Sequence, residues 1–207
     1  MQGVLELLES YRDIRDRLYQ RRIAAGIVEK ILLALGMAVI TGLAAQIRIQ
    51  LPWSPVPITG QTFAVLLSGI LLGEMWGGVS MAIYIVLGIA GIPWFTGWTA
   101  GFMHLAGPTG GYIWGFVIAA LFLGYTTDRF VKARSFIVLF GLMLLTNFVI
   151  IYGAGLIQLY AWLNYVKGSA TGLTDLLYMG LVPFIAGDVT KAFLAAMLGR
   201  VLLPSKK

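Results

Sequence analysis

Two opposite charges lie close together in an otherwise apolar stretch, within residues 187–191 (Gly-Asp-Val-Thr-Lys). Asp188 and Lys191 are three residues apart, so in a helix they share one face and partly neutralise each other. A carboxylate accepts hydrogen bonds from N–H groups, whereas an ammonium donates to a carbonyl oxygen. The pair therefore predicts a site for a small ligand with adjacent N–H and C=O groups. The alternative is a structural ion pair that satisfies itself. Pro183 lies just upstream and predicts a kink near this site.

A second group of residues that could contact a ligand forms an uncharged, aromatic loop at residues 92–101 (Ile-Pro-Trp-Phe-Thr-Gly-Trp-Thr-Ala-Gly). Its aromatic residues fit either an interfacial belt or a lid that stacks on an apolar ring and opens at its glycines. Residues 107–112 (Gly-Pro-Thr-Gly-Gly-Tyr) follow and begin a helix, whose N-terminal amides are suited to an anion.

Several enzyme sites are missing from the sequence. The chain has one histidine, His104, and no cysteine, so a metal site or a histidine-based triad lacks partners. No phosphate-binding loop of the form G-x-x-x-x-G-K-[ST] occurs. We therefore expect no enzyme activity, no cofactor and no ATP hydrolysis by this chain.

The composition predicts a protein that crosses a membrane several times. Of 207 residues, 59% are hydrophobic and only 12% are charged, whereas a soluble domain carries about 25% charged residues. Intrinsic disorder is excluded because it requires low hydrophobicity and high net charge.

Long uncharged stretches divide the chain into segments of the length that a membrane span requires, about 20 residues. Prolines and glycines divide the longest stretch further. The pattern predicts six helices, at residues 27–47, 59–73, 76–92, 110–127, 135–160 and 176–203, of which the second is short.

The basic residues predict the orientation. With the N-terminus in the cytoplasm, only Arg48 and Lys167 of the 15 basic residues fall outside, and Lys191 lies within a span. Positive residues concentrate on the cytoplasmic side of membrane proteins, so both termini are expected there. The net charge of +6 then faces the anionic lipid of the bilayer, and no nucleic-acid partner is expected.

Residues 4–22 have apolar side chains at roughly helical spacing among acids and arginines. This pattern predicts an interfacial helix along the cytoplasmic headgroups, with a solvated extension as the alternative. The predicted organisation is thus an amphipathic helix at 1–24 and a transmembrane substrate-binding domain at 25–207.

Small residues recur every fourth position in the first span, at Ala34, Ala38 and Gly42. Such rows let helices approach closely. Either packing inside the chain or contact with a partner protein explains this row.

Four motifs, in this order and spacing, resemble the BioY family, the biotin-binding S components of energy-coupling factor (ECF) transporters. They are residues 55–62 (Pro-Val-Pro-Ile-Thr-Gly-Gln-Thr), 88–93 (Gly-Ile-Ala-Gly-Ile-Pro), 107–112 and 187–191. The resemblance covers about residues 30–203. It implies an all-α polytopic fold with six transmembrane helices, in the cell membrane, that captures biotin from outside. Delivery is then powered by partners, a T component and ABC-type ATPase subunits that use the ATP.

The resemblance also implies roles for individual residues. Asp188 and Lys191 match the family's ligands for the ureido ring of biotin. The remaining ligand-binding residues implied are Thr99, Gln61, Trp98 and Tyr112. Ala34 and Ala38 resemble the small-residue motif that docks on the T component. The partner of the biotin carboxylate stays open between Arg48 and the amides near Gly110.

Two other functions remain compatible with the sequence. One is an S component for another vitamin, which competition among vitamins distinguishes. The other is a stand-alone carrier coupled to protons through Asp188, which predicts uptake without an ATPase partner.

Overall fold

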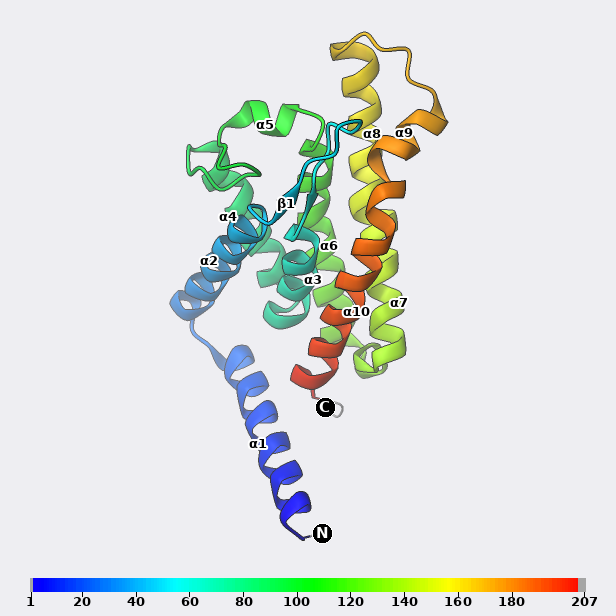
Figure 1. The fold of residues 1–207 in the computed structure, drawn as a ribbon. Coiled ribbons are helices and arrows are strands. Elements are labelled where there is room, and N and C mark those ends of the chain that lie inside the picture. The colour runs from blue at the N-terminus through cyan, green and yellow to red at the C-terminus, as the bar shows by residue number, and fades with distance from the viewer. Residues whose placement is uncertain (1, 205–207) are drawn as a thin grey trace.

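The computed structural model describes residues 2–204, which form a bundle of apolar helices (Figure 1). Met1 and residues 205–207 of the expected domain bounds lie outside the described part of the chain. Apolar helices overlap each of the six predicted ranges, but the count of six spans stays a prediction. Four helical segments are long and apolar enough to cross a membrane: Ile27–Ala44, Gly110–Arg129, Phe136–Val166 and Leu173–Leu202.

The first of these segments is α2 and the second is α6. The third joins α7 (Phe136–Leu145), a π-helix (Thr146–Ile151), α8 (Tyr152–Ala161) and a second π-helix (Trp162–Val166). The fourth joins α9 (Leu173–Gly180), a 3-10 turn (Val182–Phe184) and α10 (Ile185–Leu202). The turn contains Pro183, so the expected interruption is present, because proline cannot donate the helical hydrogen bond.

The other two predicted ranges contain shorter helices. These are α3 (Gln61–Leu72, 12 residues) and α4 (Glu74–Ile89, 16 residues), and both are below the length of about 20 residues that a straight span needs. Gly73 separates them with a positive φ of 83°, a conformation that favours glycine.

Four short elements were not expected from the sequence. Strands β1 (Arg48–Ile49) and β2 (Ile58–Thr59) pair antiparallel across the proline-rich loop, with Arg48 opposite Thr59. Helix α5 (Phe102–Ala106) follows the aromatic loop, and a 3-10 turn (Val131–Arg134) follows α6. The hairpin and α5 lie at the end of the bundle opposite to the two chain ends (Figure 1).

Helix α6 lies at the centre and packs against α3, α4 and α8. Glycines allow the close approach. A Cβ atom on Gly69 would lie 2.8 Å from the Ala120 carbonyl oxygen, and one on Gly124 would lie 2.4 Å from the Gly73 carbonyl carbon. Backbone atoms cannot move aside as flexible side chains can, so these positions fix how α3 and α4 sit on α6.

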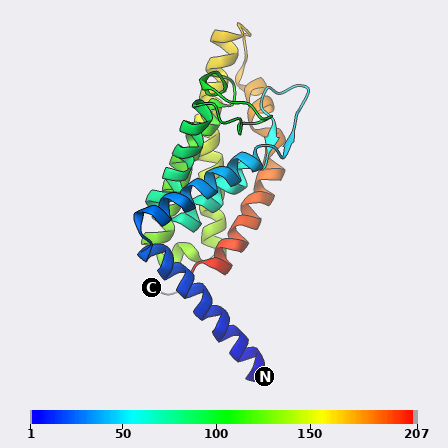
Figure 2. The same ribbon diagram turned by 90° about the vertical axis from the view of Figure 1, so that its left-hand side faces the viewer.

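Helix α1 (Gln2–Ala24) runs beyond the bundle at the end that also holds the C-terminus (Figure 2). A polar cluster attaches it there. Arg22 pairs with Asp128 at 2.5 Å, and buried Arg134 donates to the Tyr19 hydroxyl at 2.7 Å. The Tyr19 ring lies between the two guanidinium groups, 4.5 and 4.8 Å from their central carbons. Farther out, apolar side chains of α1 such as Leu7 and Leu18 are exposed.

We predict that Gly124→Ala lowers the unfolding temperature of the detergent-solubilised protein, because overpacking costs about 1–3 kcal/mol. Gly141→Ala in α7 is the matched control, since a Cβ there meets nothing within 4 Å. Equal unfolding temperatures for the two variants in a thermal melt would contradict the packing described here.

Candidate functional site

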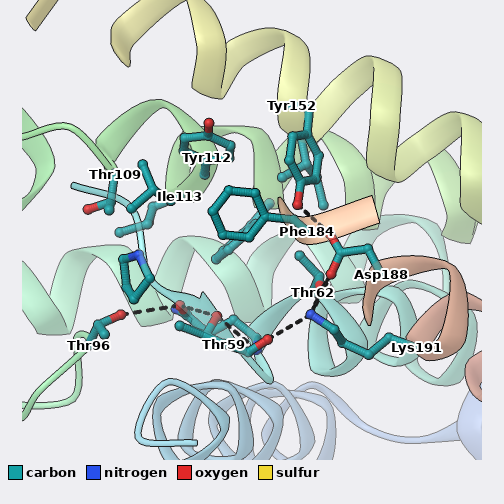
Figure 3. A pocket seen from close by; sticks show the side chains of 15 residues that line it. Thr59, Thr62, Thr96, Thr109, Tyr112, Ile113, Tyr152, Phe184, Asp188 and Lys191 are labelled. Carbon is teal, nitrogen blue, oxygen red and sulfur yellow. Dashed lines mark hydrogen bonds and ion pairs between the residues drawn. The ribbon is translucent and has the colours of Figure 1, made fainter. Parts of the chain in front are cut away.

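A narrow cavity lies among the helices, beside the hairpin, and contains the predicted Asp188–Lys191 pair (Figure 3). Its volume is about 50 Å³. The residues that line it come from the hairpin, α3, the aromatic loop, α6, the π-helix with α8, and the start of α10. They are Val56, Pro57, Thr59, Gln61, Thr62, Thr96, Thr109, Tyr112, Ile113, Phe116, Ile151, Tyr152, Phe184, Asp188 and Lys191.

Asp188 is buried, with 2% of its side chain exposed, and four donors surround its carboxylate. Thr62 Oγ1 donates to Oδ1 at 3.1 Å, and Lys191 Nζ forms an ion pair with the same oxygen. Asn147 Nδ2 and the Tyr152 hydroxyl donate to Oδ2 at 2.9 and 2.6 Å. The carboxylate is therefore fully hydrogen-bonded within the protein, as a buried charge must be.

Lys191 has three acceptors. Besides Asp188, its ammonium donates to the Thr59 carbonyl at 2.8 Å and to Thr62 Oγ1 at 3.1 Å. Its side chain is 18% exposed, so it is the more accessible member of the pair. The hairpin is thus tied to α10 through a single cationic group (Figure 3).

The break before α10 places Asp188 in the first turn of that helix, where the helix dipole favours a negative charge. It also turns the Phe184 ring toward the cavity (Figure 3). The carbonyl of Gly180, the last residue of α9, accepts a hydrogen bond from the Tyr112 hydroxyl at 2.8 Å. The break therefore positions both the charged and the aromatic parts of the site.

The π-helix at Thr146–Ile151 supplies a residue that the sequence analysis missed. Asn147 is 1% exposed, and its Oδ1 is the buried side-chain oxygen without a hydrogen-bond partner among the described residues. An unsatisfied buried acceptor costs about 1–3 kcal/mol, and π-helical turns are frequent at functional sites. The available signals were two polar side chains, those of Asn147 and Tyr152, five residues apart in a long apolar stretch.

The middle of the cavity is aromatic. Tyr112 and Tyr152 meet edge to face with ring centroids 5.4 Å apart, and the Phe184 ring lies 6.1 Å from Tyr152. Gln61 lies toward the aromatic loop. Its Oε1 accepts from the hydroxyls of Thr59 at 3.1 Å and Thr96 at 3.4 Å. The structure thus brings four of the predicted site residues, Asp188, Lys191, Gln61 and Tyr112, to one cavity.

Thr99 and Trp98 do not line this cavity; Thr96 of the same loop does. Trp98 is 63% exposed. Gln46 Oε1 accepts from the Gly97 and Trp98 amides, which turns this part of the loop outward.

Thr99 instead contacts His104. The Thr99 hydroxyl is 3.0 Å from His104 Nδ1, and the Thr109 hydroxyl is 3.4 Å from Nε2. The imidazole also stacks on Phe95 at 4.9 Å. Partial burial lowers the pKa of His104, so the ring that joins the aromatic loop to Thr109 is neutral at pH 7.

The small-residue row of α2 faces the inside of the bundle. Ala34 and Ala38 have no exposed surface, and α2 packs against α4. A Cβ on Gly42 would lie 2.8 Å from the Trp94 Cβ. In this arrangement the row packs inside the chain, and docking of Ala34 and Ala38 on a T component stays a prediction.

The four helical segments that are long and apolar enough to cross a membrane define this chain as a helical membrane protein. The chain belongs to the BioY family, whose model matches residues 15–206. The "Probable biotin transporter BioY" of Methanothermobacter thermautotrophicus is 46% identical over 140 residues, which cover 68% of this chain and 89% of that relative. The "Biotin transporter BioY" of Rhizobium etli is 34% identical over 176 residues, with 84% and 91% covered.

A solved structure has the same fold. It is described as the S-component for biotin from an ECF-type ABC transporter, and it superposes with a TM-score of 0.73 at 25% identity. The match covers 84% of this chain and 90% of that chain.

We predict that Lys191→Met lowers the unfolding temperature more than the double variant Asp188→Asn, Lys191→Met does. Removing one partner leaves a buried charge uncompensated, which costs about 3–5 kcal/mol, whereas removing both charges does not. Arg200→Met, an exposed basic residue of the same helix, is the control in the same thermal melt. A double variant less stable than Lys191→Met would contradict the coupling of the pair.

Proposed function

We propose that this chain is the substrate-binding subunit of a biotin transporter, as its BioY-family relatives are named. The observation that carries the proposal is the buried acceptor and donor pair, Asp188 and Lys191, at one end of an aromatic cavity. Biotin has two N–H donors and one carbonyl on its ureido ring, an apolar thiophane ring, and a carboxylate on a flexible chain. The cavity has the charged pair at one end and the rings of Tyr112, Tyr152 and Phe184 in its middle, so its groups follow the order of the ureido and thiophane rings.

The ligand would exchange hydrogen bonds with the protein at the charged end. One ureido N–H takes the place of Lys191 or Thr62 on Asp188 Oδ1, and the freed ammonium donates to the ureido carbonyl. Asn147 does not line the contracted cavity, but it contacts Asp188, and its unpaired Oδ1 would become the acceptor for the second N–H once the cavity enlarges. Ligand binding then satisfies the one buried side-chain acceptor that lacks a partner in the described chain, which favours a ligand with two N–H groups.

The cavity must enlarge to take biotin. Ligand pockets measure about 300–1,000 Å³, whereas this cavity is about 50 Å³. The described conformation is therefore a contracted state. Pro57, Thr96 and Thr109 come from loops at its outer side, and these loops are the parts that separate when biotin enters.

We also propose how the chain is placed in the cell. The chain lies in the cell membrane with six spans, including the short α3 and α4, and with both termini in the cytoplasm. Helix α1 rests on the cytoplasmic headgroups with its exposed apolar side chains in lipid. A T component and ABC-type ATPases drive delivery, which agrees with the lack of a phosphate-binding loop in this sequence.

We predict that the purified chain binds biotin with a Kd tighter than about 1 μM, and that Asp188→Asn weakens binding at least about 100-fold. Hydrogen bonds to a charged group contribute about 1.5–3 kcal/mol, and the loss leaves Lys191 uncompensated. Titration calorimetry against a panel of vitamins is the measurement, and Asp175→Asn, exposed in α9, is the control. Weak biotin binding that Asp188→Asn leaves unchanged rejects the proposal.

The topology is testable because the chain has no cysteine. Ser135→Cys and Ser169→Cys place single exposed thiols at opposite ends of the bundle. In intact cells we expect a membrane-impermeant maleimide to label only the cysteine at 169, and to label the one at 135 after permeabilisation. Labelling of the cysteine at 135 in intact cells would place the termini outside.

A further inference from the structure

A second cavity adjoins the first on its outer side. Its volume is about 240 Å³, and it shares Pro57, Thr96 and Thr109 with the inner cavity. We call it the vestibule. Its other lining residues are Arg48, Gln50, Pro55, Met103, His104, Gly107 and Pro108. The three shared residues are thus the wall between the vestibule and the cavity that holds Asp188.

The vestibule contains one side chain with a fixed charge, Arg48, and no acidic residue. Within residues 2–204, the Arg48 guanidinium forms neither a hydrogen bond nor an ion pair with the protein. His104 does not supply a second charge, because burial lowers its pKa. The electrostatic character of the vestibule is therefore that of a single arginine, which favours a carboxylate.

The hairpin fixes where Arg48 lies relative to the inner site. Arg48 is the partner of Thr59 in the β1–β2 pair, and residues opposite each other in an antiparallel pair project from the same face. Thr59 lines the inner cavity, and its carbonyl accepts from Lys191 at 2.8 Å. Arg48 thus lies one strand farther out than Thr59, the residue that contacts Lys191.

The aromatic loop leaves room for the guanidinium. A Cβ at residue 97 would lie 2.3 Å from Arg48 Nη1, and Gly97 has a φ of 79°. Glycine is the residue that suits both this backbone conformation and the close contact. The Gly97 amide donates to Gln46 Oε1, so the loop position is held from α2.

The alternative anion site, the amide end of α6, is covered by the protein. A Cβ on Gly110 would lie 1.7 Å from the Leu105 carbonyl oxygen. Gln158 Nε2 donates to the carbonyls of Leu105 and Gly107 at 2.6 and 2.8 Å. An anion has no open approach to these amides.

We propose that Arg48 binds the carboxylate of the ligand, so that the chain of biotin extends from the inner cavity into the vestibule. This rests on the proposed function, since it takes the ureido ring to be held by Asp188 and Lys191. Arg48 is then a specificity-determining residue that selects acids over neutral derivatives with the same ring system.

The test compares biotin with its primary amide, in which the carboxylate is replaced by a neutral group of similar size. By calorimetry on the full chain in detergent, we expect the wild type to prefer biotin about tenfold. Arg48→Gln should abolish this preference and leave the affinity for the amide unchanged, which also shows that the variant is folded. Lys167→Gln, which removes the other cation expected on the outer side, should keep the preference.

The possible outcomes separate the two proposals. Equal binding of biotin and its amide to the wild type, or a tenfold preference that survives Arg48→Gln, overturns the role of Arg48. The proposed binding of the ureido ring by Asp188 and Lys191 is unaffected by either result. If neither compound binds the wild type, the proposed function itself fails, and the role of Arg48 fails with it.

Discussion

The arrangement of the whole site depends on keeping one carboxylate charged inside an apolar bundle. Asp188 is almost completely buried, and a charge in that position persists only when it is paired and hydrogen-bonded. Its donors come from three separate parts of the chain: Thr62 on α3, Asn147 and Tyr152 near the π-helix, and Lys191 on its own helix. The charge therefore holds together elements that are distant in sequence.

The same requirement explains the irregular backbone. The 3-10 turn that contains Pro183 begins α10 just before Asp188, and the π-helix brings Asn147 to the carboxylate. An uninterrupted α-helix in place of the 3-10 turn or of the π-helix would have regular backbone hydrogen bonds, but it would direct the side chains of Asp188 and Asn147 differently. The unpaired oxygen of Asn147 shows that the polar groups around Asp188 are well but not completely satisfied.

The sequence predicted the apolar helices and the charged pair, because a membrane limits where charge can lie and the exceptions are conspicuous. It could not predict the β1–β2 hairpin, whose strands have two residues each and depend on the path of a proline-rich loop. Thr99 and Trp98 were placed by their loop alone, and Gln46 turns that part of the loop outward. The row at Ala34 and Ala38 indicated a close helix contact, but a spacing pattern does not identify which helix makes it. Asn147 could not be predicted either, because its hydrogen bond to Asp188 joins two residues that are distant in the sequence.

The most direct test of the central claim is an experimental structure of the chain with biotin bound. The account predicts that a ureido N–H donates to the Asp188 carboxylate and that Lys191 Nζ donates to the ureido carbonyl, with the inner cavity enlarged. A structure in which Asp188 and Lys191 keep only their present protein partners, while biotin lies elsewhere, would contradict it.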